Sequence, residues 1–144
     1  MSNERTAGQR ALSPTDITVY VGGLVAGLAL THALIAVVSD GRMGTPGRLG
    51  LAGVALFLAV FLYVRWAAIA QRRYGHYFLH VIAYVAVNAS FALHALVLYS
   101  SGRAEEIAAS WRGPLLAMPL VWAVGLFLHT IGTAVSDGYE HVDV

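Results

Sequence analysis

The sequence predicts an all-α integral membrane protein, folded as a four-helix, up-down-up-down bundle. Its composition and its four apolar stretches carry this prediction. Of the 144 residues, 58% are hydrophobic and 12% are charged, about half of the ~25% charged share of an ordinary soluble domain. One small core cannot bury so many apolar side chains, so the surplus must face lipid. The same composition excludes a disordered chain, which needs low hydrophobicity and high net charge.

The apolar stretches are residues 17–38, 49–70, 77–99 and 115–135. Each is close to the ~20 residues that cross ~30 Å of hydrocarbon, and the short links make successive helices antiparallel. The first stretch exceeds the ~7–15-residue core of a cleaved signal peptide, so we expect it to stay in the mature protein. The predicted organisation is a polar lead (1–16), a first transmembrane hairpin (17–70), a second transmembrane hairpin (71–136) and a tail (137–144).

Charge gives a weak indication of orientation, because all nine basic residues are Arg and they divide almost evenly. The side of the termini carries Arg5, Arg10, Arg65, Arg72 and Arg73, and the opposite side carries Arg42, Arg48, Arg103 and Arg112. Basic residues are in excess on the cytoplasmic side. Because Arg65, Arg72 and Arg73 cluster, we expect a multi-pass cell-membrane protein with cytoplasmic termini.

Several function classes lack their usual residues. The chain has no Cys, which excludes disulfides, thiolate metal sites and Cys nucleophiles. No Ser/His/acid grouping, phosphate-binding loop or dinucleotide fingerprint occurs, and no basic face is available for nucleic acid. The helix interiors also lack carboxylates for acid/base chemistry or metal binding. We therefore expect no enzyme, no catalytic residues, no metal site, no nucleic-acid partner and no small-molecule substrate.

Four histidines lie inside the apolar stretches: His32, His80, His94 and His129. Ionisable groups inside a bilayer are costly, so each is a candidate functional residue. At 100° per residue, Tyr84 and Asn88 share a face with His80, and Trp122 shares one with His129. Because lipid cannot satisfy polar groups, we predict a polar seam between the third and fourth helices, made of His80, Tyr84, Asn88, Trp122 and His129.

The depths of the histidines leave the cofactor question open. Antiparallel helices place His80 and His129 in the half nearer the termini, and His32 and His94 in the opposite half. His80 and His94 are 14 residues apart, or roughly 21 Å of helix, a spacing that resembles the paired axial histidines of membrane cytochromes b. The first interpretation is hydrogen bonding between helices without a cofactor. The alternatives are an electron-transfer subunit in which these four histidines ligate b-type haem, and a pH or metal sensor.

Two further patterns concern helix packing. The segment ALTHALIAVVSDGR, residues 29–42, is similar to FALHALVLYSSGR, residues 91–103, which aligns His32 with His94. This similarity indicates either two tandem hairpins of one design or a chance likeness of apolar helices. Gly23 and Gly27 form a small-xxx-small pair nearly opposite His32, which favours either a homodimer or close packing inside the bundle. Gly125 is expected to pack closely beside His129.

The second hairpin, residues 67–136, resembles the 2TM domain family. The similarity lies in RRYGHYFLHVIAYVAVN at 72–88, then in Trp111, Pro114, Trp122 and VGLFLH at 124–129. It implies polar family positions at His80, Asn88 and His129, in domains that occur alone or beside signalling modules such as histidine kinases, with no activity attached. The first hairpin lacks the Tyr-Val-x-Val-Asn run. Together with the residue pattern, the resemblance favours a non-enzymatic scaffold or sensor module with a membrane-protein partner.

Overall fold

A computed structural model gives the fold of the chain and describes residues 12–72 and 74–137. Its described part is all helical. Four spans are long and apolar enough to cross a membrane: Pro14–Val38, Thr45–Val64, Gly75–Ser100 and Gly113–Gly132, with mean hydropathies from 1.8 to 2.1. The predicted all-α class with four membrane-spanning helices is thereby confirmed. Arg5, Arg10 and Arg73, most of the predicted lead and most of the tail lie outside the described residues.

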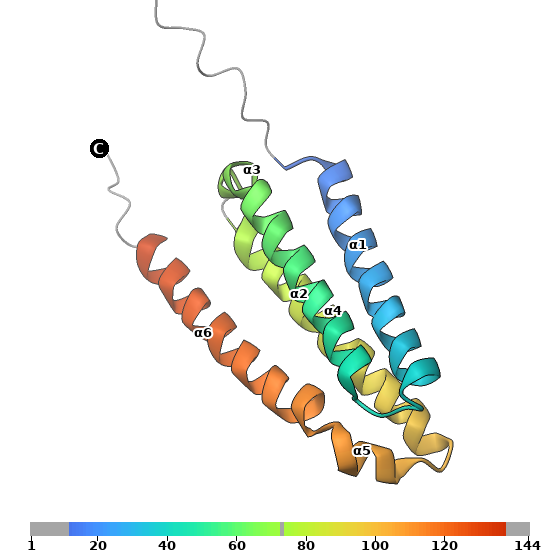
Figure 1. Cartoon of the computed structure of the whole chain (residues 1–144). Helices are drawn as coiled ribbons and strands as arrows, with labels where there is room; N and C mark the ends of the chain where they lie inside the picture. The colour runs from blue at the N-terminus through green and yellow to red at the C-terminus, as the bar shows by residue number, and fades with distance from the viewer. Residues whose placement is uncertain (1–11, 73, 138–144) are drawn as a thin grey trace, which may run out of the picture.

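The chain alternates direction between two ends (Figure 1). The elements in order are α1 (Pro14–Ala33) with a π-helical turn (Leu34–Val38), α2 (Thr45–Val64), α3 (Trp66–Ala70), α4 (Gly75–Ser100), α5 (Ala104–Ser110), a second π-helical turn (Gly113–Ala117) and α6 (Met118–Asp137). The start of α1 and the end of α6 lie at one end, here called the terminal end. The links that follow α1 and α4 lie at the other, the loop end.

Local sequence signals explain where the helices begin. Ser13 and Asp16 form a capping box at the start of α1, in which the Asp16 amide donates to Ser13 Oγ at 3.2 Å and the Ser13 amide donates to the Asp16 carboxylate at 2.9 Å. Helix α2 begins at Thr45 with Pro46 in its first turn, where the missing N–H of proline costs no helical hydrogen bond. The predicted run 49–70 is divided in two, because the helix breaks at Arg65 and resumes as α3.

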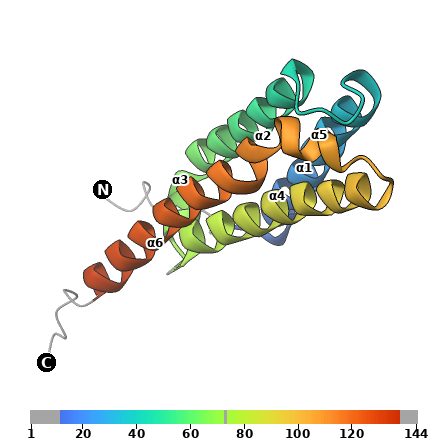
Figure 2. The ribbon, with the colours of Figure 1, turned by 90° about the horizontal axis from the view of Figure 1, so that it is seen from below.

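The buried core lies among α1, α2 and α4. On α4 the buried side chains recur every four residues, as Leu79, Ala83, Val87, Phe91 and Ala95, and so form one stripe along the helix. Helix α6 stands at the side of this group (Figures 1 and 2) and packs against α4 through the partly buried Met118 and Trp122. No residue of its most apolar 18-residue stretch is buried. The buried side chains of the bundle therefore come mainly from α1, α2 and α4, and α6 packs on α4 as the outer helix of the second hairpin.

Candidate functional site

The loop-end half of the bundle contains a direct pair of histidines. His32 of α1 and His94 of α4 face each other with their Nδ1 atoms 2.9 Å apart and their ring centroids 5.0 Å apart. In a hydrogen bond between two imidazole nitrogens, one ring donates N–H and the other accepts with its lone pair. The pair therefore joins the first hairpin to the second inside the apolar span, at the depth expected from the sequence.

Aromatic rings enclose this pair. Phe91 meets the His32 ring edge-on with centroids 4.8 Å apart, and Trp111 lies 5.0 Å from the His94 ring. His32 Nε2 is buried and has no hydrogen-bond partner among the described residues. An unpaired buried acceptor is tolerated better than an unpaired N–H. The arrangement therefore favours the tautomer in which His32 donates from Nδ1 and keeps only a lone pair at Nε2.

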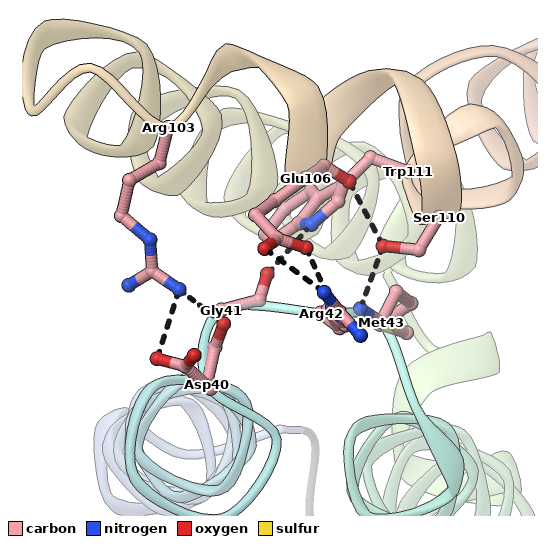
Figure 3. Close-up of polar contacts among 8 residues, drawn as sticks. All are labelled: Asp40, Gly41, Arg42, Met43, Arg103, Glu106, Ser110 and Trp111. Atoms are coloured by element: carbon pink, nitrogen blue, oxygen red, sulfur yellow. Dashed lines mark hydrogen bonds and ion pairs between the residues drawn. The ribbon is translucent and has the colours of Figure 1, made fainter.

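A set of polar contacts, here called the loop clasp, connects the link after α1 with Arg103 and with the segment from Glu106 to Trp111 at the loop end (Figure 3). Its members are Asp40, Gly41, Arg42, Met43, Arg103, Glu106, Ser110 and Trp111. Arg42 Nε donates to Glu106 at 2.7 Å, and Arg103 donates to the Asp40 carboxylate at 2.9 Å. Each hairpin thus supplies an Arg to a carboxylate that belongs to the link of the other. The hydrogen bond with Glu106, and then its charge, raise the pKa of the Arg42 guanidinium above its ordinary value.

The backbone in the clasp is held by two further side chains. Trp111 Nε1 donates to the Gly41 carbonyl at 2.9 Å, and the Met43 amide donates to Ser110 Oγ at 3.0 Å. Gly41 has φ +76°, and a Cβ there would lie 2.9 Å from a nitrogen of Arg103. Only glycine adopts this backbone conformation without strain. The backbone conformation of the turn that follows α1 therefore allows close contact with Arg103, Ser110 and Trp111 of the second hairpin.

The second histidine pair lies towards the terminal end, between α4 and α6. The ring centroids of His80 and His129 are 5.5 Å apart, and Tyr77 stacks on His129 at 6.2 Å with an interplanar angle of 17°. Tyr84 and Trp122 meet edge-on at 5.9 Å. Four of the five predicted members of the polar seam, His80, Tyr84, Trp122 and His129, therefore lie at the contact between these two helices.

The bonding in the seam differs from the prediction. His80 Nδ1 donates to the His76 carbonyl at 2.7 Å, and Asn88 Nδ2 donates to the Tyr84 carbonyl at 2.7 Å. Both bonds stay within α4, because the carbonyl one turn earlier is within reach of a short polar side chain. Asn88 Oδ1 is buried without a partner among the described residues. Ring packing, more than hydrogen bonds between helices, therefore joins α4 to α6 at these positions.

The glycine predictions have two outcomes. A Cβ on Gly23 would lie 2.3 Å from the Phe57 ring, and one on Gly27 would lie 3.0 Å from Val54. Both glycines therefore pack against α2 inside the bundle, which is the second of the two alternatives given for this pair. Gly125 was expected to bring helices together, yet nothing lies within 4 Å of its Cβ position. Gly125 therefore lies on an exposed part of α6 and not in a close helix contact.

The histidine geometry also bears on the haem alternative. Two axial imidazole nitrogens on opposite sides of a haem iron are about 4 Å apart, twice a metal–nitrogen bond of ~2 Å, whereas those of His32 and His94 are 2.9 Å apart. To ligate a haem iron, the two rings of each histidine pair would have to move apart so that the iron lies between them. At 2.9 Å, the His32–His94 pair does not fit this role. Within the described residues, no group of three or more His, Cys, Asp or Glu is placed to hold a metal ion.

Several contributors were missed by the sequence reasoning. Arg65, at the end of α2, forms an ion pair of 2.9 Å with Asp16 in the first turn of α1. Glu106 and Trp111 are buried in the loop clasp. The acidic Glu105-Glu106 pair in a short link was the available signal, but its partner Arg42 is 64 positions away in the sequence.

Comparison of the chain with protein-family models, curated proteins and solved structures finds no match.

Proposed function

We propose that the chain is a non-enzymatic, multi-pass cell-membrane module that serves as a scaffold or sensor partner for another membrane protein. The observation that carries this proposal is the exposure of α6. Its most apolar stretch has no buried residue, whereas the corresponding stretches of the other three spans are 11% to 28% buried. An apolar helix at the side of a bundle has a long face available to another protein.

One face of α6 has the chemistry of a helix contact. Gly125 and Gly132 are exposed on this face and have nothing within 4 Å of their Cβ positions. Small residues let two helix backbones approach closely. This surface, defined by Gly125 and Gly132 and here called the α6 glycine face, therefore fits a transmembrane helix of a partner, while the nearby His129 packs against Tyr77 and His80 of α4.

The rest of the molecule suits a scaffold role. The His32–His94 bond and the loop clasp connect the two hairpins at two levels, which favours a single arrangement of α1, α2 and α4. The resemblance of residues 67–136 to 2TM domains, which occur beside signalling modules, points in the same direction. On this proposal the histidines stabilise helix association, and the signal passes through a membrane-protein partner or a second copy of the chain. The termini are assigned to the cytoplasmic side.

Crosslinking in native membranes tests the proposal. Because the sequence has no Cys, a single Cys can carry a photoreactive probe at Gly125 or Gly132, with Phe127 as the matched control. Phe127 is two positions from Gly125, or 200° around the same helix. We expect a discrete protein adduct from the two glycine positions and none from Phe127, with twice the chain mass if the partner is a second copy. Lipid adducts alone at all three positions would contradict the proposal.

A further inference from the structure

The loop-end halves of α2 and α6 enclose a groove of about 530 Å³. Its lining residues are Met43, Arg48, Leu51, Ser110, Gly113, Pro114, Ala117, Met118 and Val121. The opposite side of the groove runs from Pro114 in the second π-helical turn to Val121 in α6, which is seven steps along the helix or about 10 Å. Since the hydrocarbon core is about 30 Å thick, the groove stays within the leaflet on the loop side.

Two exposed arginines that form no ion pair with a described residue belong to the walls of this groove or adjoin them in sequence. Arg48 is exposed and lines the groove, and Arg112, also exposed, directly precedes Gly113 of its wall. By contrast, the arginines at 42, 65 and 103 each form an ion pair. No ion pair of Arg48 or Arg112 occurs within the described part of the chain. The groove therefore combines an apolar wall with uncompensated positive charge at the level of the lipid headgroups.

We propose that this groove binds an anionic phospholipid, with one acyl chain between α2 and α6 and the phosphate at Arg48 and Arg112. Charge complementarity favours this occupant, because basic pockets between transmembrane helices bind anionic headgroups. A single acyl chain is much thinner than a helix about 10 Å across and fits in a groove of this size. The site is at the opposite end of α6 from Gly132 and does not depend on the proposed partner.

Native mass spectrometry of the full chain in mild detergent can measure the binding. The probes are dioleoyl phosphatidylglycerol and dioleoyl phosphatidylcholine, which share acyl chains and differ in headgroup charge. We expect tighter binding of phosphatidylglycerol. At about 1 kcal/mol for each basic residue, Arg48→Gln should weaken binding about fivefold, and the double variant with Arg112→Gln about 25-fold. Arg72→Gln, at an exposed Arg of the terminal end, is the matched control and should leave the affinity unchanged.

A second variant tests the apolar part of the site. Ala117→Trp places a large ring in the groove and should weaken the binding of both lipids. If this variant fails to fold, the arginine variants still test whether the groove binds an anionic lipid. Equal affinity for the two lipids, or an equal loss with Arg72→Gln, would overturn the proposal. Displacement of the lipid by inorganic phosphate would indicate a simple anion site and would also overturn it. A dimer would also overturn the proposal if phosphatidylglycerol did not affect it and the Ala117→Trp variant were monomeric. A second copy of the chain would then occupy the groove.

Discussion

Substitution of the paired histidines gives the sharpest prediction about stability. His94→Leu removes the 2.9 Å bond and leaves His32 with no partner at Nδ1, while its Nε2 already has none among the described residues. Hydrogen bonds between helices in membranes contribute about 0.6 kcal/mol on average and up to about 1.7 kcal/mol. An unpaired buried polar group costs about 1–3 kcal/mol. Because both rings are only partly buried, we expect His94→Leu or His32→Leu to lower the free energy of unfolding by about 1–2 kcal/mol.

A double-mutant cycle separates the bond from other effects of the two substitutions. The double Leu variant replaces both partners by apolar groups, so it should lose less than the sum of the single variants. The free energies are measured by SDS-induced unfolding in mixed micelles. Leu93→Ala, at an exposed position beside His94, is the control for changes on the surface of α4 and should have little effect. Strictly additive losses, or single variants as stable as the wild type, would refute the reasoning.

The remaining predictions concern helix contact and the loop clasp. Gly23→Ala should destabilise the protein by about 1–3 kcal/mol, because the new methyl group overlaps Phe57 in a packed contact. Gly125→Ala should be tolerated, and equal unfolding midpoints for the two variants would contradict the packing described. Trp111→Phe should cost about 0.5–1.5 kcal/mol through loss of the bond to the Gly41 carbonyl. Near-UV circular dichroism during unfolding measures this loss, and the argument fails if stability is unchanged.

Hydropathy and helix geometry predicted a large part of this structure. The four spans and their antiparallel order follow from run length and short links, and the depth arithmetic paired His32 with His94 and His80 with His129. Depth is readable from sequence because the rise per residue is constant. The polar seam was located for the same reason, since Tyr84 and Trp122 fall on predictable faces.

Which helices pack tightly was not predictable in the same way. Lipid tails are as apolar as Leu, so apolar residues do not reveal whether a face meets lipid or protein. Most residues of α6 are apolar, so its sequence did not reveal that none of the most apolar part of its span is buried. The Arg42–Glu106 and Arg65–Asp16 ion pairs join segments distant in sequence, and no local pattern specifies such partners. The bonds of His80 and Asn88 to their own helix depend on side-chain conformation, which helix periodicity does not determine.

A visible spectrum distinguishes histidines that join helices from histidines that ligate a haem. The protein is purified in mild detergent from haem-replete cells, and spectra are recorded in the oxidised and the dithionite-reduced states. With His32 and His94 bonded to each other, we expect no Soret or α band above background. Bands at about one haem or more per chain that disappear in His94→Leu would contradict the account and make the protein a cytochrome.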